Sequence, residues 1–418
     1  MMRALFAGVS GLRNHQTMMD VIGNNIANVN TTAFKSSRVT FKEAFVQLLQ
    51  GASRPPGNSG GINPVQIGTG MNIGSIDQQF TQGSLETTGQ PLDLAIQGDA
   101  LFMLSDGQKN VYTRAGNFQL DAQGHLISPS SGFIVQGINA DAQGNFSSAS
   151  AIGDVQLRLG DKSPAQATSA VTLSGNLDSS AAAGTIKTMA QVVYDSTGTP
   201  ENLTLTFTKN NTPGSWDWSA SCPTGAITPA GNGNVTFSNT GSLASFTYPG
   251  GGSTFTITPS SGGAPMDITV NAGTINGIDG LASYANPSNA VIAGQNGYQA
   301  GSLQSVSVDT KGVVSGYFTN GNTRSLAQIS LAQFTNPSGL LGSGDNTYLE
   351  SANSGGAVVG FAGGTISSTI TPGALEGSNV DISQEFTDMI IAQRGFQANA
   401  KVITTADQML NDLVNLRQ

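Results

Sequence analysis

The sequence predicts an α+β fold in which two long terminal helices enclose a mainly-β middle. At both ends of the chain, apolar residues recur every seven positions, which is the spacing of a helix with one apolar face. Between about 66 and 370, short apolar or alternating segments are separated by turn residues, which is typical of strands. Because helices at both termini with none between them are unusual on a globular domain, we expect the two to pair into a coiled-coil-like inner layer. Two ordinary surface helices are the alternative.

The first helix is expected from about Arg3 to Ile26. An isolated amphipathic helix gains little unless its apolar face finds a partner, so this face is predicted to be an assembly interface. The apolar run ends at Arg13 while the helical pattern continues, so a cleaved signal peptide is not predicted. The predicted interface residues on this helix are Leu5, Val9, Leu12, Met19 and Ile26.

The second helix is expected to span about 35 residues near the end of the chain. Asp381 is a plausible N-cap, and Gln384 stands three positions later, which is the spacing of a capping box. Its apolar face is predicted to pack against the first helix or against other subunits. The interface residues expected there are Ile382, Phe386, Met389, Phe396, Ile403 and Leu410.

Side-chain amides lie beside both apolar rows. Amides donate and accept hydrogen bonds without the desolvation cost of a charge, so we interpret them as a polar stripe for repeated subunit contacts. Helix termination would explain Asn28 but not Asn24 and Asn25. The polar residues added to the predicted interface are Asn24, Asn25, Asn28, Gln393, Arg394 and Asn399.

Four D-x-x-G tetrads predict hairpin connections in the middle of the chain, because aspartate opens a type I turn and glycine takes the left-handed position after it. A shift to Ser/Thr/Ala-rich strands near 156–165 and a return near 299 indicate one β domain inserted into another. The predicted division is a terminal helical polymerisation domain (1–30 and 376–418), extended connecting segments (31–65 and 365–375), a first β domain (66–155 and 299–364) and an inserted outer β domain (156–298).

The composition argues against most chemistry. Only 10% of residues are charged, the net charge is −9 and no basic cluster occurs, so neither nucleic acid nor an anionic membrane surface is an expected partner. No membrane span is expected. The two histidines and the single cysteine, Cys222, have no partners at ligand or triad spacing. We predict no catalytic, cofactor-binding or metal-binding residues and no enzyme activity. A hydrolase whose two carboxylates come together only in the folded chain stays an open alternative.

Several stretches carry a resemblance to a known family. "MDVIGNNIANVNTTAFKSSR" at the start and "GSNVDISQEFTDMIIAQRGFQANAKVI" near the end resemble the paired terminal signatures of the bacterial flagellar rod and hook proteins. "VYTRAGNFQLDAQGHLISPSSGFIVQG" resembles the first β domain of this family. "QVVYDSTGTPENLTLTFTK", followed by Trp216 and Trp218, resembles the outer domain of its hook branch.

This resemblance implies a structural subunit of the flagellar hook, in the extracellular part of the flagellum. Such a subunit assembles with itself into a flexible tube, a universal joint between motor and filament with a central export channel. Implied partners are the hook cap, the distal rod protein, the junction proteins and the flagellar type III export apparatus. The distal rod branch is the alternative, because residues 46–70 resemble it and would stiffen the joint. A secreted β-rich adhesin or hydrolase is a remote third.

Overall fold

The chain divides into two compact units. The computed structural model describes residues 2–52, 62–141, 143–147, 151–157, 160 and 162–415. Unit 1 comprises Met1–Arg158, Val306–Ser315 and Ser325–Gln418, and unit 2 comprises Leu159–Ser305 and Gly316–Arg324. Both terminal helices belong to unit 1, whereas most of the stretch 156–298 belongs to unit 2.

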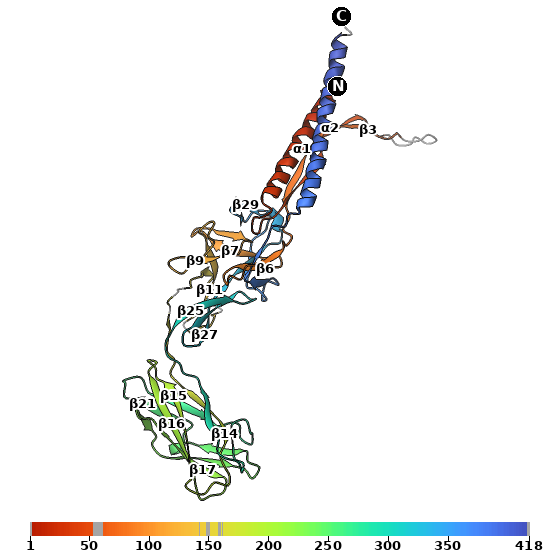
Figure 1. The fold of residues 1–418 in the computed structure, drawn as a ribbon. Coiled ribbons are helices and arrows are strands. Elements are labelled where there is room, and N and C mark those ends of the chain that lie inside the picture. Colours follow the sequence, from red (N-terminus) through yellow and green to blue (C-terminus); the bar gives the residue numbers. More distant parts are fainter. Residues whose placement is uncertain are drawn as a thin grey trace. The chain divides into compact units, whose positions relative to one another are not determined.

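The two terminal helices lie side by side (Figure 1). Helix α1 spans Met2–Ala27 and α2 spans Ile382–Asn415, so the expected helices form with nearly the expected limits. Asp381 caps α2, because its Oδ1 accepts hydrogen bonds from the backbone N–H groups of Ser383 at 2.8 Å and Gln384 at 3.3 Å. The Gln384 side chain bonds to Asp388 at 3.1 Å, so it does not complete the capping box.

Strands follow α1 where a connecting segment was expected. The stretch 31–65 contains β1 (Ser37–Glu43) and β2 (Val46–Gln50), which pair with β4 (Met71–Gln78) and β3 (Val65–Gly68). Residues 53–61 of the Gly/Pro-rich part lie outside the described residues. β1 forms because alternate apolar residues meet β4, with Val39 opposite Ile76 and Phe41 opposite Ile73. The expected extended connecting segment thus contains paired strands.

The segment 365–375 also departs from the expectation of a connection. It contains β32 (Thr369–Pro372), and β33 (Ala374–Glu376) begins within it. Their partners are β6 (Leu94–Gln97) and β5 (Leu85–Thr87), both antiparallel. Local sequence patterns do not predict the pairing of two strands that lie almost 300 positions apart in the chain.

The β structure of unit 1 surrounds β11, which pairs with β7, β10, β12 and β27. Its core contains the fully buried side chains of Phe102, Leu104, Val135 and Ile329. A 3-10 turn, η2, spans Pro337–Gly339. The remaining strands of this unit are β7 (Leu101–Ser105), β8 (Asn110–Thr113), β9 (Gln119–Leu120), β10 (Leu126–Ile127), β11 (Ile134–Asn139), β12 (Gly153–Asp154), β28 (Leu331–Gln333), β29 (Leu341–Gly344), β30 (Thr347–Leu349) and β31 (Val358–Gly360). The strands whose limits cross between the units are β25 (Gly301–Val308), β26 (Val313–Phe318) and β27 (Thr323–Ile329).

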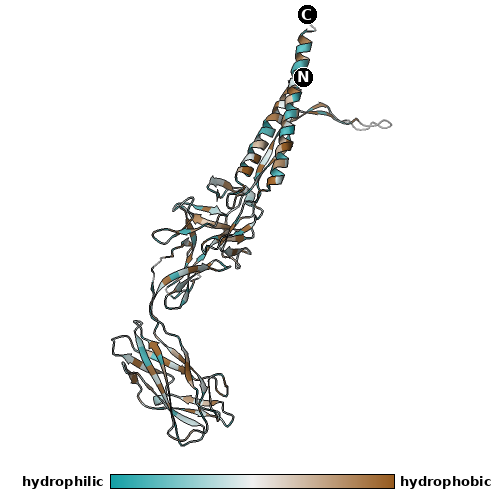
Figure 2. Ribbon diagram, viewed as in Figure 1, coloured by the Kyte–Doolittle hydropathy of each residue, from teal (hydrophilic) through white to brown (hydrophobic). Residues whose placement is uncertain are grey.

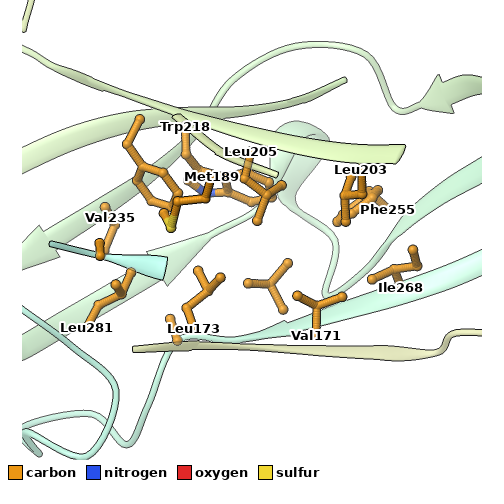
Figure 3. Close-up of a cluster of buried hydrophobic side chains, with 14 of the residues drawn as sticks. Val171, Leu173, Met189, Leu203, Leu205, Trp218, Val235, Phe255, Ile268 and Leu281 are labelled. Carbon is orange, nitrogen blue, oxygen red and sulfur yellow. The ribbon is translucent and has the colours of Figure 1, made fainter. Parts of the chain in front are cut away.

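Unit 2 has two sheets and a core of its own. One sheet has the order β15-β16-β17-β19-β20, and the other has β18-β21-β22-β14-β23 with β24 on β14. Trp218, Leu205, Phe255 and Val171 lie in the shared core, to which both sheets contribute (Figure 3). The alternating burial along β16 and β22 is the pattern of a sandwich. The elements are β13 (Lys162–Ser163), β14 (Ala170–Asn176), β15 (Ile186–Tyr194), β16 (Pro200–Lys209), β17 (Ser215–Ser221), β18 (Gly225–Thr228), β19 (Gly233–Phe237), β20 (Leu243–Thr247), η1 (Pro249–Gly251), β21 (Phe255–Pro259), β22 (Met266–Asn271), β23 (Leu281–Ala282) and β24 (Val291–Gln295).

The D-x-x-G tetrads form the turns expected of them. In the turn between β15 and β16, the N–H of Gly198 bonds to the carbonyl of Asp195 at 3.0 Å, and the glycine has a φ of 85°. The Asp195 carboxylate accepts backbone N–H bonds from Thr197 and Thr199, both at 2.8 Å. The aspartate thus satisfies the turn backbone and the glycine supplies the left-handed residue.

A buried ionic cluster in unit 1 joins segments next to both helices to the strands of that unit. Oε1 of Glu376, in β33, lies 2.7 Å from Nζ of Lys35, and Oε2 lies 2.6 Å from Nε of Arg114. Lys35 also donates to the carbonyl of Thr81 at 2.8 Å, and Arg114 donates to the carbonyl of Ala100 at 2.5 Å. All three charged side chains are almost completely buried.

Opposite effects act on the ionisation of this cluster. Burial raises the pKa of Glu376, but the positive charges of Arg114 and Lys35 outweigh it and hold that pKa below its ordinary value. Burial lowers the pKa of Lys35 against the attraction of Glu376. Because both carboxylate oxygens and both cations have hydrogen-bond partners, removing one member leaves an uncompensated buried charge.

Glu376→Gln is expected to destabilise unit 1 by about 3 kcal/mol at neutral pH, since Lys35 and Arg114 would lose their counterion. A folded-state pKa below the ordinary 4.5 means that this stabilisation is complete above pH 4.5 and is lost as the pH falls through the folded-state value. Urea unfolding followed by circular dichroism at several pH values measures both effects.

The matched control is Glu86→Gln. Glu86 lies on β5 opposite Leu375, the neighbour of Glu376, and its side chain is exposed. The control should unfold like the unmodified chain at every pH. Equal unfolding midpoints for the two variants would contradict a stabilising role for the cluster.

Candidate assembly interface

The helix pair is antiparallel and comes closest at glycines. A Cβ atom on Gly8 would lie 3.1 Å from Cγ1 of Ile403, and one on Gly11 would lie 2.7 Å from the amide of Asn399. On the other helix, a Cβ on Gly395 would lie 2.5 Å from the His15 ring. The backbones therefore approach so closely that only glycine fits at these contacts without a shift of the facing side chain.

The seam contains a second row of residues that a count of large apolar side chains overlooks. On α1 this row is Gly8, His15 and Ile22, and on α2 it is Glu385, Ala392, Asn399 and Ala406, each repeated every seven positions. Ile22, Ala392 and Ala406 are buried. Part of this row was hidden in the sequence because Gly8, Ala392 and Ala406 do not register as large apolar residues in a hydrophobic pattern.

The predicted interface residues occupy three environments in the single chain. Asn25 is buried. Val9, Asn24, Ile382, Phe386, Gln393 and Arg394 are exposed. The half-buried residues are Leu5, Leu12, Met19, Ile26, Asn28, Met389, Phe396, Asn399, Ile403 and Leu410. Their role between subunits stays a prediction.

The amides have roles within the chain, which changes the interpretation of them as a stripe for subunit contacts. Asn25 Nδ2 donates to the carbonyl of Ser37 at 2.8 Å and to Oε1 of Glu385 at 2.9 Å, and its Oδ1 accepts from the N–H of Ser37 at 3.0 Å. It thus connects α1 with both β1 and α2. Asn28 donates to the carbonyl of Asn24 at 2.9 Å, at the end of α1. Asn399 donates to the carbonyl of Gly395 at 2.9 Å.

A large apolar surface stays uncovered on the helices. Apolar and polar residues are interspersed along both helices in Figure 2, and many apolar side chains lie outside the seam. Phe386, for example, is 51% exposed. The exposed large apolar side chains are Met2, Phe6 and Val9 on α1, and Ile382, Phe386, Ile390, Ile391, Val402, Met409, Leu413 and Val414 on α2. Exposed large apolar side chains gathered in this number on two paired helices indicate an interaction site.

The hairpin of β2 and β3 adds to this surface. Every residue of both strands is exposed, and Phe45 just before β2 is 86% exposed. In Figure 1, β3 projects sideways from the level of the helix pair. The exposed apolar residues of this hairpin region are Phe45, Val46, Leu48, Leu49, Ile62, Val65 and Ile67.

Two of the groups considered for chemistry, His125 and Cys222, have local partners. Nδ1 of His125 lies 3.1 Å from Oδ2 of Asp121 in a turn, and the half-buried thiol of Cys222 donates to Glu201 at 3.6 Å. Within the described ranges, no three His, Cys, Asp or Glu side chains gather where a metal ion could bind. Neither helix of the described chain is both long and apolar enough to cross a membrane.

Gly11→Leu is expected to lower the melting temperature of the helix pair, because the new side chain would enter the space of Asn399 at a cost of about 1–3 kcal/mol. The measurement is thermal unfolding by far-ultraviolet circular dichroism. Gly23→Leu is the control, since a Cβ there meets nothing within 4 Å and leucine favours a helix over glycine. If the two variants melted alike, close packing at Gly11 would be refuted.

Four family models match consecutive parts of the chain. The flagella basal body rod protein model matches residues 5–35, and the flagellar hook protein FlgE/F/G D1 domain matches 95–159. The flagellar basal body protein FlaE D2 domain matches 161–298, and the flagellar basal body rod FlgEFG protein C-terminal model matches 371–416. The matched segments include α1, most of unit 2 and α2.

Individual proteins agree with these matches. The chain is 40% identical to the flagellar hook protein FlgE of Borreliella burgdorferi over the full length of both chains. It is 31% identical to the flagellar basal-body rod protein FlgG of Bacillus subtilis, again with full coverage of both. The crystal structure of Helicobacter pylori flagellar hook protein FlgE2 covers 68% of this chain and 98% of its own, with a TM-score of 0.50 and 14% identity. The chain belongs to the flagellar hook protein (FlgE) family of axial flagellar proteins.

Proposed function

We propose that this chain is the structural subunit of the bacterial flagellar hook and assembles into a flexible helical tube. The carrying observation is the apolar surface that α1, α2 and the β2–β3 hairpin leave exposed in a single chain. In water such a surface favours association, and additional copies of the same chain would cover it. The tube would act as a universal joint that transmits torque from rod to filament.

The paired helices would form the innermost layer, around a channel through which later subunits pass. The strands of unit 1 and the whole of unit 2 would lie outside this layer. Flexibility is supported by composition. Only 10% of residues are charged, and between Trp218 and Met266 the sequence has no charge at all. Contacts between such neutral surfaces are exchanged at low cost as neighbours slide during rotation, whereas buried ion pairs would resist the exchange.

Export and partners follow from the same proposal. The chain would leave the cell unfolded through the flagellar type III export apparatus without a cleaved signal peptide. Its single cysteine is compatible with threading, because no intramolecular disulfide can form. The hook cap, the distal rod protein and the hook–filament junction proteins would meet the growing or finished tube.

The distal rod protein is the less favoured candidate. The D2-domain match at 161–298 coincides with most of unit 2, which has its own buried core. The identity is also higher to the hook protein of Borreliella burgdorferi, at 40%, than to the basal-body rod protein of Bacillus subtilis, at 31%. The exposed β2–β3 hairpin lies in the stretch that resembles the rod branch, so we propose that it stiffens the joint rather than changes its identity.

Phe396→Asp is expected to abolish polymerisation while the β structure of units 1 and 2 stays folded. Phe396 is half-buried on α2, and a carboxylate there would lack a partner. Sedimentation of the purified chain, with electron microscopy of the pellet, measures assembly. Curved tubes would support the hook, and short straight tubes would favour the rod.

Gln397→Asp serves as the control, because it places the same charge one position away on an exposed side chain. This variant should sediment like the unmodified chain. Normal polymers from Phe396→Asp would show that the helix seam is not needed for assembly.

A further inference from the structure

A cavity opens where α1, β1 and the first turns of α2 meet. Its volume is about 240 Å³. The apolar part of its wall comes from Met18, Val21 and Ile22 on α1, and the acidic part comes from Glu385 and Asp388 on α2. An apolar cavity of ~150 Å³ accommodates benzene, so this one has room for the end of a long side chain.

The charges around the cavity leave its acidic side unneutralised. Arg38 also lines the cavity, but its guanidinium lies 3.8 Å from the carboxylate of Asp77. Within the part of the chain that is described, neither Glu385 nor Asp388 forms a salt bridge. Glu385 accepts a hydrogen bond from Asn25 and Asp388 accepts one from Gln384, and both donors are neutral amides.

The pKa of Glu385 reflects this environment. Burial raises it above its ordinary value, and the negative charges of Asp388 and Asp381 act in the same direction, against the hydrogen bond from Asn25. A cation placed in the cavity would relieve both the burial penalty and the repulsion between the carboxylates.

Arg394 is the matching cation on the same helix. It stands nine residues after Glu385, which is two and a half helical turns, so the two side chains leave α2 on opposite faces. Its side chain is exposed, and no described residue forms a salt bridge with it. An acidic cavity and an unpaired guanidinium on opposite faces are the arrangement of a contact that repeats from copy to copy.

We propose that Arg394 of one copy occupies the cavity beside Glu385 and Asp388 of the neighbouring copy. The inference rests on the proposed self-assembly and specifies one of its contacts. The methylene stem of arginine would lie against the apolar wall while its guanidinium meets the carboxylates with its planar set of donors. The two surfaces differ, so the contact is heterologous and can propagate into an open helical polymer.

The contact also sets a stagger between neighbouring helix pairs. Arg394 lies six residues from Asp388 and nine from Glu385, which at 1.5 Å per residue is an axial shift of about 9–14 Å. At the rim of a cavity the ion pair is partly solvated, so it fixes register more than it adds affinity.

The test is charge reversal and its restoration in the full-length chain. Arg394→Asp and Asp388→Arg are each expected to raise the critical concentration for polymerisation about tenfold, and by more at low ionic strength, because like charges then face each other. The double variant should return to within about threefold of the unmodified chain. Asp388 is chosen over Glu385 because the bond of Glu385 to Asn25 joins the two helices, whereas the bond of Asp388 to Gln384 lies within α2.

Lys311→Asp is the matched control, since it reverses one exposed charge on a turn of unit 1 away from the helices. It should polymerise normally. Unchanged critical concentrations in both single variants, or a double variant no better than the worse single one, would overturn the Arg394 contact while the unmodified chain still forms tubes. Failure of the unmodified chain to form tubes, even when seeded with hook fragments, would instead overturn the proposed function and this inference with it.

Discussion

The arrangement of unit 1 depends on the carboxylate of Glu376. Lys35 follows α1, Arg114 follows β8 and Glu376 immediately precedes the turn into α2, so three distant segments meet at one charge. The carbonyls of Thr81 and Ala100 accept hydrogen bonds from the two cations, and the N–H of Gly83 donates one to Glu376, which completes the site. Such a cluster adds little net stability compared with an apolar core, but separating its members would leave buried charges unpaired. It therefore fixes where both helices leave the β structure.

Beyond this cluster, the two helices are held together by close contact between their backbones rather than by many buried large apolar side chains. Glycines at 8, 11 and 395 bring the backbones together, and Asn25 connects the end of α1 to β1 and α2. As a consequence, most large apolar side chains of the helices stay exposed or half-buried in the single chain. The single chain forms its own cores and keeps apolar surface exposed, as a self-assembling subunit requires.

Local sequence signals predicted the elements that depend on local physics. The helix limits, the cap at Asp381 and the D-x-x-G turns all follow from interactions within a few residues, and all of them form. The cluster at Glu376 was not predicted, because its members are separated by up to 341 residues and each looks like an ordinary surface charge. The strands at 37–50 and 369–376 were missed for the same reason, since their partners lie elsewhere in the chain.

The distribution of charge reconciles rigidity with sliding. The strongest ionic contacts that the structure describes lie inside unit 1, where they hold one chain together and would stay unchanged when neighbours shift. Between subunits, an uncharged surface leaves mainly weak contacts, which exchange at little cost. A solvated pair such as Arg394 with Asp388 belongs to the second class, because water replaces its partners whenever it opens. A flexible joint of rigid parts thus requires that buried charges stay within subunits and solvated ones lie between them.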